Sequence, residues 1–99
     1  MARLDWTQEA EDWLRVIFDY IAEDNPAAAA DVVEGIYQRS QVLVNHPEIG
    51  HKFEGMDRNV RVLLYGHYRI AYLLRSPEEI DILGVFHGAL EINRYLGKL

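Results

Sequence analysis

Apolar residues recur at two different periods along the chain, and the change falls near residue 58. In the first half they recur every three or four residues, which is the spacing of one face of an α-helix. The members of the first such stripe are Ala10, Trp13, Leu14, Ile17 and Ile21. In the second half, runs rich in β-branched, leucine and aromatic residues alternate at period two, as strands do. The pattern therefore predicts helices first and strands afterwards.

Two helices are expected over residues 8–23 and 26–45, after a short strand at 3–6. Thr7 can cap the first helix, and Asn25 can cap the second. Pro26 suits the first helical position, where no amide donor is needed. Because Asn25 and Pro26 end one helix and begin the next, they predict a helical hairpin. Gly35, in the middle of the second helix, suggests a close contact between the two helices.

The second half predicts antiparallel strands over residues 59–65, 67–75 and 80–87, after a loop at 46–59. Gly66 allows the turn between the first two strands. On the second strand one set of alternating residues is apolar, whereas the other set is mixed. A short helix is expected at the C-terminal end. The fold class is therefore α+β: an N-terminal strand and a helical hairpin packed on a small antiparallel sheet, in one domain over residues 1–99.

Composition and charge narrow the possible functions. The chain has 99 residues, no cysteine and a net charge of −6. No apolar run approaches the ~20 residues of a membrane span, and the N-terminus lacks the apolar core of a signal peptide, so a cytoplasmic location is expected. Residues 1–34 hold nine acidic residues against two arginines. Because phosphate backbones favour clustered Lys and Arg, this balance disfavours sequence-specific binding of nucleic acid by the chain alone.

Histidines are the first candidates for chemistry. His87 ends the last predicted strand, where a general base could lie. Three interpretations of His87 stay open: a structural residue that closes the sheet, a contact to a partner, or a catalytic acid or base. The other histidines, His46, His51 and His67, share no spacing typical of metal ligands, so neither a metal nor a cofactor is expected.

Five segments, in order, resemble a known family. They are "W-T-x-x-A" near the start, "YIAEDNPAAA", "HPEIG", "RVLLYGHYRIAY" and "ILGVFHGA", and together they cover Asp5 to Ala89. In this order and at these distances they resemble the ParE-type toxins of the RelE/ParE superfamily, which are plasmid stabilisation toxins of bacterial toxin–antitoxin pairs. The resemblance implies the toxin component of a type II toxin–antitoxin system.

The superfamily scaffold serves two activities, so the resemblance alone leaves the activity open. RelE-like members cleave messenger RNA on the ribosome, and ParE-like members inhibit DNA gyrase. The residues that could cleave RNA form a sparse set: Arg61, His67, Arg69, His87, and Arg94 or Tyr95. Ala89 stands where the family often has a basic residue, and Lys52 and Lys98 are the only lysines. We therefore expect no catalytic residue and predict a gyrase inhibitor. The alternatives are a RelE-type ribosome-dependent endoribonuclease and a non-toxic relative that binds antitoxin.

The resemblance also implies a cognate ParD-like antitoxin with which the chain forms a hetero-oligomer. Its expected contacts are the mixed sheet face, the apolar edge of the first helix and the last helix. The residues assigned to this antitoxin surface are Arg61, Arg69, Leu73, Leu90, Arg94 and Leu96. The target would instead meet carboxylates on the first helix, at Glu9, Asp12, Asp19 and Glu23, which could face basic DNA-handling regions of gyrase.

Overall fold

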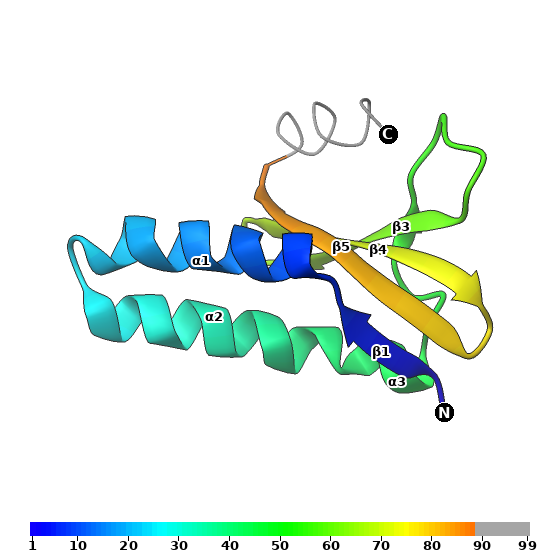
Figure 1. The fold of residues 1–99 in the computed structure, drawn as a ribbon, viewed down its shortest axis with the longest axis horizontal. Coiled ribbons are helices and arrows are strands. Elements are labelled where there is room, and N and C mark those ends of the chain that lie inside the picture. Colours follow the sequence, from blue (N-terminus) through cyan, green and yellow to red (C-terminus); the bar gives the residue numbers. More distant parts are fainter. Residues whose placement is uncertain (89–99) are drawn as a thin grey trace.

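A computed structural model describes residues 1–88, in which a helical hairpin lies beside a five-stranded sheet (Figure 1). The helices are α1 (Gln8–Ala22), α2 (Pro26–Ser40) and the short α3 (Val42–Asn45). The strands are β1 (Arg3–Trp6), β2 (His51–Lys52), β3 (Val60–Tyr65), β4 (Tyr68–Ser76) and β5 (Glu79–His87). The helix expected at the C-terminal end lies outside the described residues. In residues 1–88, no helix is long and apolar enough to cross a bilayer.

Side-chain caps begin both helices of the hairpin, as the sequence predicts. Thr7 Oγ1 accepts a hydrogen bond from the Ala10 amide at 3.1 Å, and Asn25 Oδ1 accepts one from the Ala28 amide at 3.0 Å. The Thr7 hydroxyl also donates to the carbonyl oxygen of Ile82 at 2.7 Å, so one residue both starts α1 and ties it to β5. At its other end the hairpin extends beyond the sheet (Figure 1).

The second predicted helix is divided. It was expected over residues 26–45, but α2 ends at Ser40 and α3 begins at Val42, with Gln41 between them. Ser40 is buried, and its hydroxyl donates to the carbonyl oxygen of Tyr37 at 2.7 Å. A hydroxyl that competes for a backbone carbonyl in this way favours the end of a helix or a bend in it.

The α+β class and the antiparallel pairing of the three strands predicted beyond residue 58 are confirmed, but the sheet as a whole is mixed because β1 joins it parallel to β5. The strand order is β1-β5-β4-β3-β2, with β1 parallel to β5 and the other neighbours antiparallel. The segment predicted as a loop at 46–59 contains β2, which pairs with β3 at Arg61 and Val62. Two residues are too few to produce an alternating pattern. The sequence pattern also does not indicate which strand pairs with β1, because the helical hairpin separates β1 from the other strands along the chain.

The expectation of one core face and one mixed face is confirmed: on the second face, buried apolar residues share β4 with the half-buried Arg69 and the exposed Arg75. The cluster on the hairpin side combines helix and strand residues: Ala10, Leu14, Ile36, Leu43, Leu63, Ile70, Tyr72, Leu74, Ile80, Ile82 and Val85. The cluster on the opposite side contains Val60, Val62, Ala71, Leu73 and Phe86. Because successive strand residues alternate between faces, β4 is buried on both sides along its centre.

Two glycines are explained by their surroundings. Gly66 has φ of +57°, a left-handed conformation that suits the predicted turn between β3 and β4. Gly35 lies against the ring of Tyr65 on β3, and a Cβ at this position would overlap the Tyr65 hydroxyl. The close contact predicted at Gly35 is therefore between a helix and the sheet, and not between the two helices.

The helix α1 lies along the far half of β5. The strand β1 pairs with β5 only along Glu79–Ile82, and a register shift between β4 and β5 leaves Leu83 as an extra residue. Beyond it, the ring of Trp13 packs on that of Phe86 with 4.9 Å between centroids. Gly84 leaves room for this contact, since a Cβ there would lie 2.7 Å from the Phe86 ring. The end of β5 is thereby positioned beside α1.

Candidate functional site

His87 lies exposed at the end of β5, beside the turn between β3 and β4. Its ring centroid is 5.9 Å from that of His67 and 5.4 Å from that of Tyr68, which it meets edge-on. Burial raises the pKa of the Tyr68 phenol. A phenol with a raised pKa stays protonated at neutral pH, where it can donate a hydrogen bond but is a poor base. Tyr68 is therefore suited to packing and to donating a hydrogen bond rather than to taking up a proton.

Arg61 and Tyr72 hold the loop that follows α3. The Tyr72 hydroxyl donates to the carbonyl oxygen of Pro47 at 2.8 Å and accepts from the amide of Gly50 at 3.0 Å. Arg61 Nη1 donates to the carbonyl oxygens of Glu48 at 3.1 Å and Gly50 at 3.0 Å. Burial raises the pKa of Tyr72, whereas the Gly50 amide and the Arg61 charge lower it. We call these five residues the Arg61–Tyr72 latch.

The residues assigned to the antitoxin surface do not form one surface. Arg61 opposes Tyr72 in the sheet, so it lies on the hairpin side. Arg69 opposes Leu64 and Leu73 opposes Val60, on the other face. The expectation that the three share one sheet face is therefore wrong.

Leu73 is only 4% exposed, so its side chain belongs to the core. Within residues 1–88, the Nε of Arg69 is buried without a hydrogen-bond partner. The other residues of this assignment, Leu90, Arg94 and Leu96, lie outside the described part of the chain.

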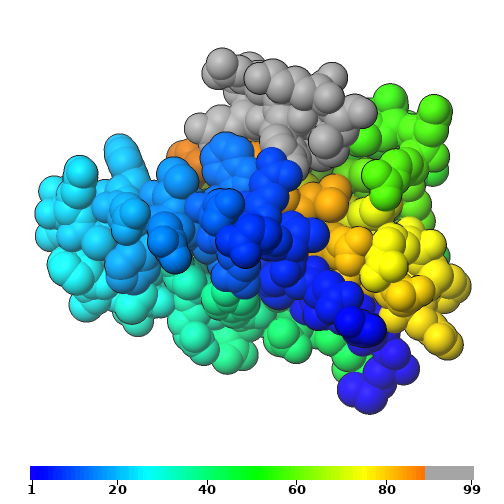
Figure 2. All heavy atoms as spheres, viewed as in Figure 1, coloured from blue at the N-terminus to red at the C-terminus, as the bar shows by residue number. Residues whose placement is uncertain are grey.

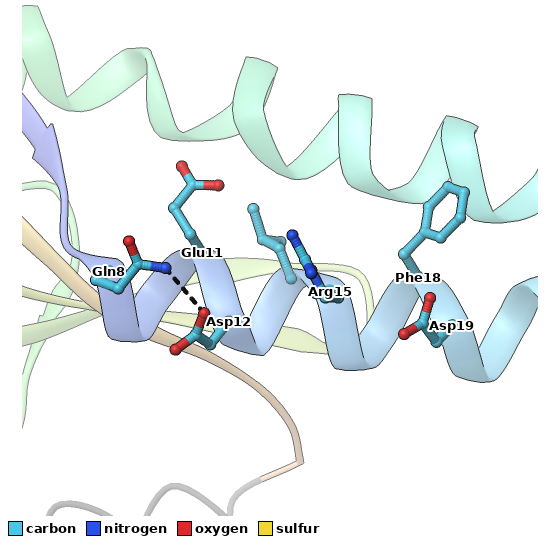
Figure 3. Close-up of a pocket in the computed structure, with 7 residues that line it drawn as sticks. Gln8, Glu11, Asp12, Arg15, Phe18 and Asp19 are labelled. Atoms are coloured by element: carbon cyan, nitrogen blue, oxygen red, sulfur yellow. Dashed lines mark hydrogen bonds between the residues drawn. The ribbon is translucent and has the colours of Figure 1, made fainter.

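The four carboxylates assigned to the target are all exposed on α1: Glu9, Asp12, Asp19 and Glu23, the last at the helix end. In Figure 3, Glu11 and Phe18 extend from α1 toward α2, whereas Asp12 and Asp19 do not. Gln8 donates a hydrogen bond to Asp12 at 2.9 Å, and together they line a shallow hollow of about 430 Å³ on this helix. In the space-filling view of Figure 2, side chains of α1 (blue) lie across the middle of the visible face of the molecule.

An apolar groove lies between α1 and the sheet, at the apolar edge of the first helix; the sequence predicted a contact at this edge but did not name the residues of a groove. We call it the α1 groove; it has a volume of about 540 Å³ and is lined by Trp13, Val16, Ile17, Tyr20, Ile21, Tyr68, Val85 and His87. Val16 is 59% exposed and Tyr20 is 79% exposed. The signal was present in the sequence: Val16 and Tyr20 are four residues apart and form a second apolar row beside the inward stripe.

A polar contact within the hairpin was also missed. The Tyr37 hydroxyl donates to the carboxylate of Glu11 at 2.7 Å and 2.8 Å from its two oxygens. Burial, followed by this hydrogen bond and the charge of Glu11, raises the pKa of Tyr37 from 10.0 to about 12. The Tyr37 ring also packs on Trp6, with 4.7 Å between centroids. Glu11 therefore joins α1 to α2, unlike the four exposed acids.

Two arginines of the sheet already have hydrogen-bond or ion-pair partners within residues 1–88. Arg61 serves the latch, and Arg75 Nε pairs with Asp81 at 2.8 Å and, through Nη1, with Glu79 at 3.3 Å. Cleavage of RNA without a metal needs an acid, a base and cations for the phosphorane charge. Over residues 1–88, no group of three or more His, Asp or Glu side chains could hold a metal ion. The described geometry thus offers two surfaces for binding: an apolar groove and an acidic helix face.

A sequence model of the family described as "ParE toxin of type II toxin-antitoxin system, parDE" matches residues 4–91. The chain belongs to this family of type II toxins. No curated protein matches the chain by sequence.

Solved structures share the fold. A chain of the chromosomal ParDE toxin–antitoxin system from P. aeruginosa is 24% identical, with a TM-score of 0.74 over 90% of this chain and 98% of that one. A chain of the RelBE2 complex from Mycobacterium tuberculosis is 22% identical, with a TM-score of 0.60 over 87% and 96%. The isolated RelE toxin of E. coli is 15% identical, with a TM-score of 0.66 over 100% of both chains. At these identities the likeness concerns the fold.

Proposed function

We propose that the protein is the toxin of a type II toxin–antitoxin pair and that it inhibits DNA gyrase by binding, with no catalysis of its own. Membership of the ParE family supports this proposal, because ParE-type toxins act on gyrase. The observation that carries it is the face of α1, where Glu9, Asp12, Asp19 and Glu23 are all exposed. An acidic ridge of this kind suits the basic surfaces with which an enzyme handles DNA.

Inhibition by binding requires no nucleophile on this chain. An inhibitor shifts a moving enzyme only by its differential affinity for the enzyme's states. Gyrase carries its own DNA-cleaving chemistry, so a toxin that prefers the cleaved-DNA state would trap broken DNA. The engagement of Arg61 in the latch and of Arg75 in ion pairs supports this mechanism over RNA cleavage.

The test is supercoiling of relaxed plasmid by purified gyrase with increasing amounts of antitoxin-free protein. We expect loss of supercoiling and accumulation of linear DNA. A variant with Asp12→Asn and Asp19→Asn should inhibit more weakly, and a variant with Asp31→Asn and Glu34→Gln serves as the matched control because it also removes two exposed acids, on α2. Full supercoiling at a large excess of folded protein would contradict the proposal.

A RelE-type activity makes a different prediction. Codon-positioned cleavage of messenger RNA in a translating ribosome, lost in His87→Ala while the variant stays folded, would favour an endoribonuclease. We expect no such cleavage. The proposed antitoxin is a ParD-like protein, and the half-buried Arg69 stays a proposed contact for it.

A further inference from the structure

The fold brings two histidines together at one end of the sheet. His67 belongs to the turn between β3 and β4, and His87 ends β5, twenty residues further along the chain. Both side chains are exposed. Their ring centroids are 5.9 Å apart, with an angle of 44° between the ring planes. Spacing along the chain does not indicate this pair, because it is strand pairing that brings the two rings together.

The backbone holds both histidines in place. Strand β4 pairs with β5 so that Tyr68 lies opposite His87. The amide of Gly88 donates a hydrogen bond to the carbonyl oxygen of His67 at 3.3 Å. Gly66, with φ of +57°, precedes His67 in the tight turn, where a glycine at the first position suits a hairpin. Side chains on strands and tight turns are positioned more precisely than side chains on long loops.

The separation of the rings matches two imidazoles that bind one metal ion. A ring nitrogen binds zinc at about 2.0–2.1 Å, and its lone pair points outward in the ring plane, so the ion lies about 3.2 Å from the ring centroid. Two rings on one ion, at angles between tetrahedral and linear, therefore have centroids about 5.2–6.4 Å apart. The observed 5.9 Å lies within this range. Because both side chains are exposed, small rotations aim one nitrogen of each ring at the ion.

We propose that His67 and His87 bind one divalent transition-metal ion, such as Zn²⁺ or Ni²⁺, through one imidazole nitrogen each. Imidazole is a good ligand for zinc, nickel and copper, whereas Mg²⁺ and Ca²⁺ prefer oxygen ligands. Within residues 1–88 no third His, Asp or Glu side chain joins the pair, so water completes the coordination of the ion. A site with two protein ligands is open, unlike the four-ligand sites of structural zinc, and takes up its ion reversibly.

A bound ion would join the turn between β3 and β4 to the end of β5. In the unfolded chain the two histidines meet only at the entropic cost of closing the loop between them, so the ion binds the folded chain better. A ligand that prefers the folded state stabilises it by mass action. The stability of the protein should therefore depend on the concentration of the metal.

The experiment is a calorimetric titration of the purified protein, without a histidine tag, with ZnCl₂, NiCl₂ and MgCl₂. We expect one zinc or nickel ion per chain and no binding of magnesium. His67→Gln should raise the Kd for zinc at least tenfold, because it removes one of the two protein ligands. His46→Gln is the matched control, since His46 is an exposed histidine at the end of α3 and not a member of the pair. Its Kd should stay within twofold of that of the unchanged protein.

Thermal melts provide the folding control and a second measurement. Melts without metal establish that each variant is folded, which matters most for His87→Gln because the His87 ring packs on Tyr68. His67 lies in the turn, so His67→Gln tests the site without changing that contact. Zinc should raise the Tm of the unchanged protein and of His46→Gln, and should leave the Tm of His67→Gln where it is.

Four results would overturn the inference. These are a folded protein that binds no zinc, a His67→Gln variant whose Kd stays within twofold of the unchanged protein, equal losses in His67→Gln and His46→Gln, and a dimer that forms only with zinc. Such a dimer, detected by light scattering, would place the ion between two copies and not between two histidines of one chain. The measurements contain neither gyrase nor antitoxin, so their outcome is independent of the proposed function.

Discussion

The Arg61 and Tyr72 side chains of the latch are hydrogen-bonded within the fold, whereas side chains on the outer side of α1 are exposed to solvent. The outer side of α1 means here Asp12, Val16, Asp19 and Tyr20. In the latch, Tyr72 is fully buried, and its hydroxyl both donates and accepts a hydrogen bond. On α1, Tyr20 is 79% exposed beside a row of exposed acids. The two tyrosines belong to the same small domain, yet one is part of the core and the other lies on the surface.

The difference separates residues that build the fold from residues that are available for binding. A polar group in the latch already has its partners, so removing it leaves others unsatisfied. A residue on the outer side of α1 can be changed at little cost to folding, and its effect should appear when a partner is present. Stability and binding measurements on matched variants therefore test this division directly.

The largest expected effect comes from Tyr72. Tyr72→Ala should lower the free energy of unfolding by about 3–5 kcal/mol, because it removes a fully buried ring from the core. Tyr72→Phe keeps the ring and removes only the hydroxyl, and should cost about 1–3 kcal/mol, because the Gly50 amide and the Pro47 carbonyl lose their partner. Urea unfolding followed by circular dichroism measures both. Equal stability of Tyr72→Phe and the unchanged protein would show that the two hydrogen bonds of the Tyr72 hydroxyl contribute nothing to the fold.

Arg61 should have the next largest effect. Arg61→Met keeps most of the aliphatic stem and removes the guanidinium, and should lower the free energy of unfolding by about 1.5–3 kcal/mol, since charge-assisted hydrogen bonds to two carbonyls are lost. Arg69→Met is the matched control on the same sheet, because the buried Nε of Arg69 has no partner in residues 1–88. It should cost less. A larger loss in Arg69→Met than in Arg61→Met would contradict the structural role assigned to Arg61.

Much of the fold could be predicted, because helix caps and the spacing of apolar residues are clear along most of the chain. Thr7 and Asn25 were predicted as caps, and both accept the expected amide hydrogen bonds. The strands beyond residue 58 fall within one residue of the predicted bounds. The partner of β1 could not be predicted, because pairing between distant segments depends on how the hairpin packs. The two residues of β2 were missed because they are too few to show a period.

The candidate site was less predictable, for a physical reason. The sequence of a strand does not show whether a given arginine or leucine faces the solvent or the core. Arg61 and Leu73 were both assigned to an antitoxin surface. Arg61 is instead hydrogen-bonded to the loop after α3, and Leu73 is buried in the core. Helix exposure was predicted better, because Asp12 and Asp19 lie opposite the apolar stripe of α1 and are indeed exposed. What they bind stays a prediction.

Tyr37 predicts a pH dependence of stability. Its pKa is raised from 10.0 to about 12 in the fold, so between these values the folded protein keeps the proton that the unfolded chain loses. This stabilising contribution is complete below pH 10 and falls as the pH rises toward 12. Tyr37→Phe should cost about 1 kcal/mol at pH 8, through the lost hydrogen bond to Glu11. It should also show a shallower loss of stability between pH 8 and pH 10.5. Urea unfolding at the two pH values measures this, and an unchanged slope would contradict it.

The smallest expected effect on stability belongs to Tyr20, and it tests the division most sharply. Tyr20→Lys should change the free energy of unfolding by no more than about 0.5 kcal/mol, because surface substitutions away from the core seldom do more. Lysine is at least as good a helix former as tyrosine, so α1 itself is not weakened. The measurement is urea unfolding of the toxin alone, with Tyr72→Phe in the same series as the buried counterpart. A loss above 1 kcal/mol would mean that Tyr20 packs on the fold of the isolated protein, and the outer side of α1 could then not be treated as a surface kept for a partner.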